Sequence, residues 1–412
     1  MVKYEKFTLD NGLKVIVHQD KNTPIAVMNV LYDVGARDEN PTKTGFAHLF
    51  EHLMFGGSIN IPNYDGPLQM VGGENNAFTT NDMTNYYLSL PLQNLETGFW
   101  LESDRMLSLA FTEKSLEVQR SVVIEEFKQR YLNQPYGDVW LLLSPLAYKE
   151  HPYNWATIGK EISHIENATL QDVKDFFYKF YRPNNAILCV AGNVKVNDIK
   201  ALAEKWFGSI EKGDVPKRNL PKEPKQTEHR LLEVERKVPA NAIYKAYKMC
   251  DRHSQEYYTS DLISDVLSRG KSSRLYKELV KGKQIFSEIN AYVSGYFDDG
   301  LFIVGGKIND KYTVEEADEA IQNVLNDLSS NGISETELIK VKNKVESTIL
   351  FSEINVLDKA MNLAIGELLG DANLVNTEID EYRKVTAEDI KKVSGKLFQQ
   401  TNCSTLYYRK KK

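Results

Sequence analysis

The segment at residues 209–230 separates the chain into two parts and limits what it can fold into. Pro216, Pro221 and Pro224 lie here among lysines and arginines, with few apolar side chains. Such a composition cannot build a core, and the prolines make the segment a semi-rigid, solvated linker. With 412 residues, the chain is long enough for two or three domains of ~100–200 residues each. We therefore predict three parts: an N-terminal domain at 1–215, a linker at 216–230 and a C-terminal domain at 231–412.

Both parts show strand-like and helix-like patterns in a similar order. In the first part, two alternating runs meet at Asn11-Gly12, the dipeptide most typical of a β-hairpin. The strand-like segments of this part are 7–17, 25–34, 75–90 and 186–191, and the helical segments are 42–55, 92–109 and 113–132. In the second part, the strand-like segments are 231–238 and 289–308, and the helical segments are 260–281 and 314–328. Hairpins with interleaved helices favour an α+β fold of two related domains, each a mainly antiparallel sheet packed with helices.

Charge and composition exclude several classes of function. The 51 basic and 57 acidic residues give a net charge of −6, so no positive field is available to hold nucleic acid. No apolar run approaches the ~20 residues of a membrane-spanning helix, and we expect no membrane partner. The three cysteines are odd in number and widely separated, which predicts free thiols. The N-terminus lacks a secretory signal pattern, so we expect a cytoplasmic protein, or a periplasmic one if a leader has been removed.

The segment His48-Leu49-Phe50-Glu51-His52 carries the clearest chemistry. Positions i, i+3 and i+4 share one face of a helix, so both imidazoles and the carboxylate point the same way. Two histidines one turn apart can bind one tetrahedral Zn²⁺ through neutral ring nitrogens, and a carboxylate beside them can take a proton from water. The flanking residues are apolar, and three polar side chains in such a helix are costly without a bound partner. This favours a zinc site over two ordinary histidines of an amphipathic helix.

A catalytic zinc site needs a third protein ligand, which we expect to be an acid from another element. The helical segment 117–126 offers two glutamates, Glu125 and Glu126. Gln119, Val122 and Glu126 share one helical face, and Glu125 is rotated from it by one position. Helical phase alone does not decide which glutamate faces the histidines, so both are candidates.

Further segments along the chain match one known family. They run from end to end of the sequence: Asn11-Gly12-Leu13-Lys14-Val15, Gly72-Gly73, Asn76-Ala77-Phe78-Thr79, Asp82-Met83-Thr84-Asn85-Tyr86-Tyr87, His151-Pro152-Tyr153, Pro183-Asn184-Asn185 and Lys271-Ser272-Ser273-Arg274-Leu275-Tyr276. Together with the inverted zinc motif H-x-x-E-H, the signature of inverzincins, they make the chain resemble the M16 (pitrilysin-like) metallopeptidases. It is similar in particular to the short two-domain members related to the mitochondrial processing peptidase subunits.

The resemblance implies a zinc endopeptidase that holds one Zn²⁺ per chain and cleaves extended or unfolded peptides. It assigns His48 and His52 as zinc ligands and Glu51 as the general base. It places the third ligand at Glu126, with Glu125 as the alternative. The implied architecture is the M16 peptidase (LuxS-like) fold, in which a chain of this length forms half of a clamshell.

The resemblance also implies where a substrate binds. The residues Asn76, Ala77, Phe78 and Thr79 would form an edge strand beside the metal. An exposed edge offers unpaired backbone groups, so a substrate peptide can add to it as a further strand with little demand on its sequence. A plain edge strand without this role is the simpler alternative.

Two departures from the family pattern bear on activity. Many members carry a glutamate seven residues before the distal ligand, where this chain has Gln119. We expect Gln119 and Glu125 to lie next to the metal ligands without binding the metal. A neutral amide at position 119 would weaken the electrostatic tuning of the site. Complete members also carry an arginine and, seven residues on, a tyrosine that reach the substrate, and here Val280 and Ser287 stand in those places. Neither side chain can stabilise an oxyanion as that pair does. We therefore expect a heterodimer with a homologous M16 subunit that supplies the pair; the alternative is a non-catalytic assembly or peptide-binding subunit.

Overall fold

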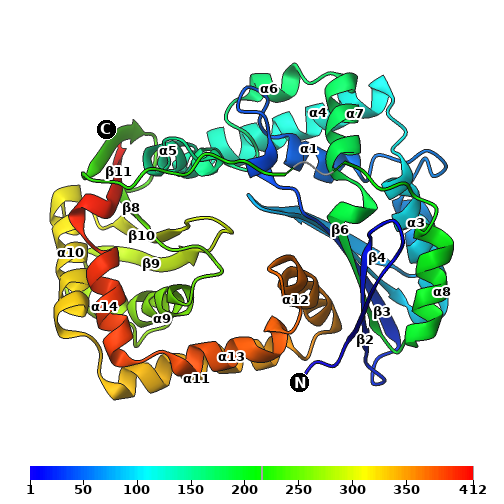
Figure 1. Ribbon diagram of the computed structural model, residues 1–412. Helices are drawn as coiled ribbons and strands as arrows, with labels where there is room; N and C mark the ends of the chain where they lie inside the picture. Colours follow the sequence, from blue (N-terminus) through cyan, green and yellow to red (C-terminus); the bar gives the residue numbers. More distant parts are fainter. Residues whose placement is uncertain (215–216, 412) are drawn as a thin grey trace. The chain divides into compact units, whose positions relative to one another are not determined.

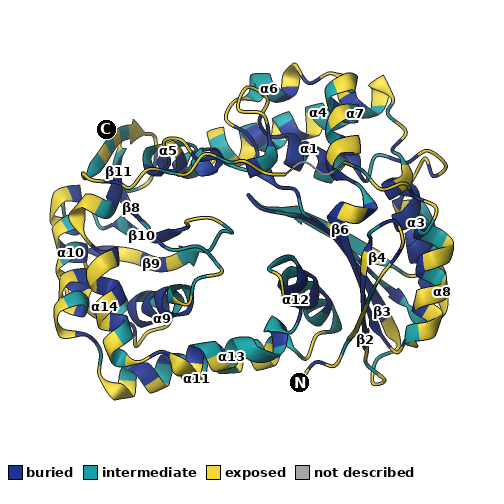
Figure 2. Ribbon diagram, in the orientation of Figure 1, coloured by how far each residue is buried: buried dark blue, intermediate teal, exposed yellow. Residues whose placement is uncertain are grey.

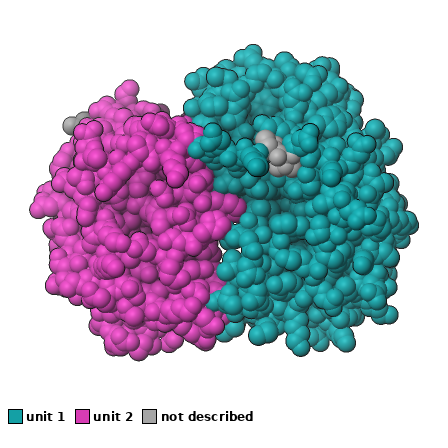
Figure 3. All heavy atoms as spheres, viewed as in Figure 1, with its two compact units in different colours: residues 1–129, 155–220, 350–377 teal, residues 130–154, 221–349, 378–412 magenta. Residues whose placement is uncertain are grey.

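The computed structural model describes residues 1–214 and 217–411, which form two compact units (Figure 3). Unit 1 comprises residues 1–129, 155–220 and 350–377, and unit 2 comprises residues 130–154, 221–349 and 378–412. The predicted boundary at 215/216 lies outside the described residues. Neither unit is continuous in sequence, because each part of the chain contributes a helical segment to the unit of the other part.

Two helices, α5 (Val139–Ala147) and α12 (Val356–Leu368), account for this exchange. Leu143 of α5 lies in the same buried cluster as Leu406 from the sheet of unit 2. Leu363 of α12 lies in the same buried cluster as Cys189 from the sheet of unit 1. Each helix thus buries its apolar face on a sheet built by the other part of the chain. Each compact unit therefore includes residues from both predicted domains, 1–215 and 231–412. The division into these domains and a linker at 216–230 stays a prediction.

Unit 1 is built on a six-stranded sheet (Figure 1). In spatial order its strands are β1 (Glu5–Thr8), β2 (Lys14–Gln19), β6 (Ala186–Gly192), β3 (Ile25–Tyr32), β5 (Thr84–Pro91) and β4 (Glu74–Thr79). β2 and β6 run parallel, and all other neighbours run antiparallel. β1 and β2 are consecutive antiparallel strands on either side of Asn11-Gly12, as the hairpin signal predicts. β4 lies at one edge of this sheet.

Unit 2 is built on a five-stranded sheet with the same plan. In spatial order its strands are β7 (Arg230–Arg236), β11 (Cys403–Lys410), β8 (Ala242–Lys248), β10 (Leu301–Ile308) and β9 (Phe286–Ser294). Again the first two neighbours run parallel and the others antiparallel, which repeats the pattern of β2, β6, β3, β5 and β4. The prediction of an α+β fold with two related, mainly antiparallel sheets is confirmed.

Helices accompany both sheets. Those of unit 1, besides α12, are α1 (Phe46–Leu53), α2 (Asp65–Met70), α3 (Leu95–Leu107), α4 (Glu113–Phe127), α6 (Ile162–Glu166), α7 (Leu170–Phe180) and α8 (Val196–Phe207). Those of unit 2, besides α5, are α9 (Glu256–Ser268), α10 (Val314–Asn331) and α14 (Ala387–Leu397). Two more, α11 (Glu335–Ser352) and α13 (Leu374–Lys384), extend across the divisions between the units.

Several predicted elements are shorter in the structure than their patterns suggest. The helix expected at 42–55 begins only at Phe46, because Gly45 adopts a left-handed conformation with φ of 89°. The helix expected at 260–281 ends at Ser268, two residues before Gly270 with φ of 89°, and a separate π-helical turn follows at Tyr276–Gly282. The strand-like run at 289–308 is a hairpin of β9 and β10. Left-handed glycines and turns stop elements whose apolar pattern would continue.

The central strands form the buried part of each unit. Figure 2 shows β3, β6 and β8 largely buried, whereas α8 and α10 carry many exposed residues. Among the described residues, no helix combines the length and the apolar character needed to cross a membrane.

Candidate metal centre

The helix α1 separates an apolar side from a polar side. Its buried residues are Phe46, Ala47, Leu49, Phe50 and Leu53, while His48, Glu51 and His52 are partly exposed. The ring of Phe50 lies 5.0 Å from those of Phe176 and Tyr181, so an aromatic cluster fixes the apolar side. The three polar side chains therefore share one face, as their spacing predicts.

The structure brings Glu126 of α4 to the two histidines of α1. Glu126 Oε2 lies 3.3 Å from His52 Nε2 and 3.6 Å from His48 Nε2. The two imidazole rings are 4.9 Å apart and nearly perpendicular, at 82°. One potential ligand atom from each of the three residues lies within 4.8 Å of the others, and no further group of this kind is found in the described part of the chain.

These distances fit a shared metal ion better than direct pairing. Charge-assisted N–H···O hydrogen bonds are typically ~2.7–2.9 Å long, which is shorter than either separation. A tetrahedral Zn²⁺ with bonds of ~2.0–2.2 Å holds its ligand atoms ~3.3–3.6 Å apart. The separations of Glu126 Oε2 from both imidazole nitrogens fall in that interval. Two imidazole nitrogens and one carboxylate oxygen are also a donor set typical of catalytic zinc.

Neither Glu125 nor Gln119 lies beside both histidines as Glu126 does. Glu125 pairs with Lys128 at 2.7 Å, and 61% of its side chain is exposed. It therefore faces solvent, away from the histidines. The Gln119 amide lies beside Gly56, in the turn that follows α1, two helical turns from Glu126. Of the two candidate glutamates, Glu126 is the one placed beside both histidines.

Glu51 connects the metal helix to the edge strand β4. The Thr79 hydroxyl donates a hydrogen bond of 2.7 Å to Glu51 Oε2. The segment Asn76–Thr79 pairs with β5 on one side only, because β4 is the edge of its sheet. The Ala77 N–H donates to the side chain of its neighbour Asn76 at 2.8 Å, so a backbone donor of this strand is satisfied locally rather than by another strand.

A buried arginine and three aromatic rings pack next to the C-terminal end of α1, and the sequence pattern did not predict this cluster. Arg105 is fully buried and paired with Glu102. Its guanidinium lies over the rings of Phe55, Tyr64 and Tyr86, at 5.2, 4.6 and 4.5 Å from their centroids. Such stacking on aromatic faces is favourable for a desolvated cation, and it fixes the residues that follow the metal helix. No sequence spacing relates these residues, so the sequence carried no usable signal for them.

The places of the missing arginine and tyrosine are occupied by residues with structural contacts. Val280 lies in the π-helical turn Tyr276–Gly282 and packs partly buried against the core of unit 2. Ser287 is exposed on β9, and its hydroxyl donates to the Lys307 carbonyl at 3.3 Å. Neither provides a cationic or phenolic donor.

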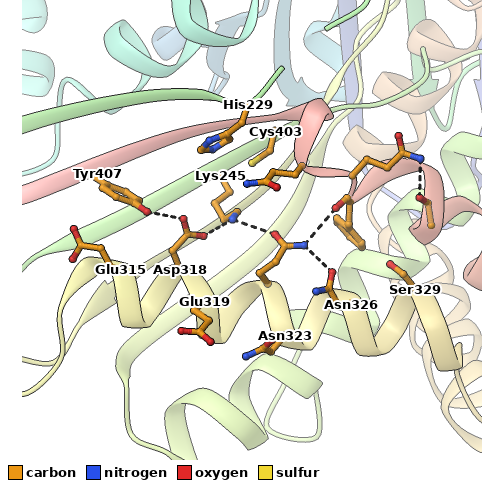
Figure 4. Close-up of a pocket in the computed structure, with 15 residues that line it drawn as sticks. His229, Lys245, Glu315, Asp318, Glu319, Asn323, Asn326, Ser329, Cys403 and Tyr407 are labelled. Atoms are coloured by element: carbon orange, nitrogen blue, oxygen red, sulfur yellow. Dashed lines mark hydrogen bonds and ion pairs between the residues drawn. The ribbon is translucent and has the colours of Figure 1, made fainter. Parts of the chain in front are cut away.

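Unit 2 contains a separate polar cavity of about 590 Å³ between α10, α14 and the sheet (Figure 4). Lys245 is buried there and pairs with Asp318, which also accepts a hydrogen bond of 2.8 Å from Tyr407. Burial, with the charge of Lys245, lowers the pKa of His229 in this cavity. Lys245 and Asp318 neutralise each other within the core of unit 2, and the group of converging metal-ligand atoms lies instead on α1 and α4.

Comparison with known proteins relates the whole chain to one family. The family model described as "Insulinase (Peptidase family M16)" matches residues 14–159, and the one described as "Peptidase M16 inactive domain" matches residues 167–345. The chain is similar to the protein named "Zinc protease PqqE" from Helicobacter pylori. The two are 31% identical over 415 aligned residues, which cover 99% of this chain and 93% of that protein.

Solved structures show the same fold. A protease from Helicobacter pylori matches with a TM-score of 0.93 at 30% identity, covering 99% of this chain and all (100%) of that one. Pitrilysin matches with a TM-score of 0.79 at 18% identity, a likeness of fold alone. The match covers 100% of this chain but only 45% of pitrilysin, so this chain corresponds to about half of it.

The geometry predicts different outcomes for the two neighbouring glutamates. Glu126→Gln removes the carboxylate beside both histidines and should weaken zinc binding by more than the ~10–100-fold that loss of an outer-shell partner costs. Glu125→Gln, the matched control one position away, should leave the affinity within a few-fold, because Glu125 faces Lys128. Competition with a zinc-binding dye measures both constants. Equal effects of the two substitutions, or a larger one for Glu125→Gln, would contradict the geometry.

Proposed function

The chain belongs to the M16 family of peptidases, and we propose that it is a zinc-dependent endopeptidase acting on extended or unfolded peptides. One observation carries the proposal: the ligand atoms of His48, His52 and Glu126 converge within 4.8 Å, next to Glu51 and an edge strand. A metal, a base and a strand-binding edge in one place are the parts that peptide hydrolysis needs.

In this proposal His48, His52 and Glu126 hold the zinc. When bound, zinc supplies Lewis acidity, which allows water to ionise near pH ~7 and polarises a carbonyl group. Glu51 takes the proton of the attacking water and later gives it to the leaving amine. The Thr79 hydroxyl bonds Glu51 Oε2, and this contact fixes the orientation of the carboxylate.

The edge strand β4 is proposed to bind the substrate backbone. A peptide that pairs with Asn76–Thr79 would lie beside Glu51, because Thr79 of the same strand contacts that carboxylate. The Ala77 N–H would then exchange its bond to Asn76 for a bond to the peptide. Backbone pairing selects an extended chain and makes few demands on its side chains, which supports unfolded peptides as the substrate class.

Substitution of the proposed base tests the mechanism. Glu51→Gln keeps the size of the side chain and the bond from Thr79 but removes the proton acceptor. It should lower kcat by ~10²–10⁴-fold while zinc stays bound at one ion per chain. A quenched fluorescent peptide measures kcat, and atomic absorption measures zinc. Glu125→Gln serves again as the control, and unchanged turnover in Glu51→Gln would remove Glu51 from the mechanism.

We further propose that the active form is a heterodimer. Val280 and Ser287 replace the arginine and tyrosine of complete members, so a second M16 subunit would supply these donors. A homodimer cannot repair this defect, because both copies lack the pair. The match to about half of pitrilysin supports a partner of similar size, since this chain covers 45% of that protein.

Turnover by the isolated chain tests the heterodimer. Loss of oxyanion donors costs ~10²–10³-fold in rate, so the purified chain should cleave an unfolded peptide slowly. Addition of a homologous M16 subunit that carries the arginine–tyrosine pair should raise kcat by about that factor. The same subunit with its arginine replaced by methionine is the matched control. Fast cleavage by the chain alone would contradict the heterodimer.

A non-catalytic role in assembly or peptide binding is the second candidate. It is favoured by the absence of the arginine–tyrosine pair and by the match of residues 167–345 to a domain described as inactive. A subunit of this kind should bind no zinc tightly and should bind peptides without cleaving them. The zinc content of the purified chain therefore separates the two candidates.

A further inference from the structure

A short turn, Gly35–Glu39, lies between the metal helix and the edge strand. Its backbone is bonded to the residues that follow β4: Ala36 N donates to Thr80 O at 3.1 Å and Arg37 N donates to Asn81 O at 2.9 Å. A Cβ at Gly35 would lie 2.4 Å from the Asn81 carbonyl oxygen, so only glycine permits this close approach. One end of the turn is thus fixed to the end of the edge strand.

The other end of the turn reaches the start of the metal helix through Glu39. Glu39 Oε2 accepts from Gly45 N and Oε1 accepts from Ala47 N, both at 2.8 Å. Trp155 Nε1 donates a third bond to Oε2 at 3.0 Å. These bonds satisfy N–H groups at a helix start, which otherwise lack intrahelical partners, and a carboxylate is favourable at this end of the helix dipole.

The helix cannot supply this cap itself. Its N-cap is Gly45, which has no side chain, and a Cβ there would lie 2.6 Å from the Ile158 carbonyl oxygen. Glu39 is only 6% exposed; burial raises the pKa of its carboxyl group, while the N–H donors of Gly45, Ala47 and Trp155 act in the opposite direction and favour the charged form. A buried carboxylate is costly, yet this one faces three donors that belong to or adjoin the metal helix.

Two arginines hold the turn in place, Arg37 from within it and Arg218 from outside. Arg37 pairs with Asp82 at 2.9 Å, and both side chains are buried. Arg218 Nε donates to Asp38 Oδ1 at 2.6 Å and its Nη1 donates to Asp33 Oδ2 at 2.7 Å. Arg218 belongs to the segment that leads out of unit 1 at Leu220. That segment is therefore tied to the turn that carries Glu39.

We propose that Glu39 is a positioning residue for the metal centre, and that Arg218 holds the turn on which Glu39 lies. The carboxylate binds the first turn of α1 at Ala47, the residue before His48, and so fixes that turn relative to the end of β4. Glu39 thus acts together with the aromatic packing of Phe50 and the Thr79–Glu51 bond in setting how the histidines and Glu51 lie relative to the edge strand. The inference rests on the proposed function, because it concerns the geometry of the same metal site.

Glu39→Gln is the direct test, because it keeps the shape but turns an amide NH₂ toward one of the two N–H donors. Zinc affinity should fall by ~10–100-fold, the usual effect of losing a group that orients metal ligands. At saturating zinc, kcat should fall while KM changes little. Amide hydrogen exchange at the start of α1 should accelerate by at least tenfold even without zinc. Arg218→Met should show the same changes to a smaller degree.

Matched controls separate positioning from general stability. Trp155→Phe removes the third bond to Glu39 and the bond from Trp155 Nε1 to the Ala36 carbonyl, but it keeps both bonds from α1 to Glu39, so zinc affinity should fall less than in Glu39→Gln. Lys14→Met breaks an ion pair with Glu367 elsewhere in unit 1 and should lower Tm without changing zinc affinity. If Glu39→Gln lowers Tm but leaves zinc affinity and exchange at α1 unchanged, the inference is wrong.

The outcome is distinguishable from failure of the proposed function. A wild-type chain that binds no zinc would overturn the peptidase proposal, whereas exchange at the start of α1 in the metal-free Glu39→Gln variant would still decide whether Glu39 positions that helix. If Glu39→Gln does not fold, Arg218→Met provides the same readouts, and unchanged exchange there would overturn the inference.

Discussion

The proposed function depends on one interaction: two imidazoles and one carboxylate lie close enough to share a single cation. The separations of 3.3 and 3.6 Å between Glu126 and the two histidines arise because α1 and α4 present their polar faces to each other. That arrangement requires the opposite side of α1 to be fixed, which the aromatic rings around Phe50 achieve. The apolar packing of α1 therefore determines where its polar side chains lie. The hydrogen bond between Thr79 and Glu51 then fixes the edge strand β4 next to them.

The fold is repeated, but its chemistry is not. The strands β2, β6, β3, β5 and β4 of the first sheet have the same spatial order and relative directions as β7, β11, β8, β10 and β9 of the second. In unit 2 the helix α9 follows the strand that corresponds to β3, just as α1 follows β3 in unit 1. α9 carries Ser260 and Asp265 on buried positions and no H-x-x-E-H sequence. Unit 1 thus carries the candidate metal ligands His48, His52 and Glu126, and α9 of unit 2 has no counterpart to the two histidines. This asymmetry agrees with the proposal that a second subunit completes the active form.

Much of this could be predicted from local patterns, and what could not depends on distant contacts. The spacing of His48, Glu51 and His52 predicts a shared face because helical geometry is local. Helical phase alone could not decide between Glu125 and Glu126, because the choice depends on how α4 packs against α1. The role of Glu39 could not be predicted, since its donors come from Gly45, Ala47 and the distant Trp155. The sequence also could not predict that α5 packs in unit 2 and α12 in unit 1, because an amphipathic pattern does not indicate which sheet a helix covers.

Anomalous diffraction from crystals of the purified chain, recorded on both sides of the zinc absorption edge, tests the metal centre most directly. We expect one zinc peak per chain, with bonds of ~2.0–2.2 Å to His48 Nε2, His52 Nε2 and a Glu126 carboxylate oxygen. A well-ordered crystal that shows no metal there, or zinc held by other residues, would contradict the proposal that this chain is a zinc peptidase.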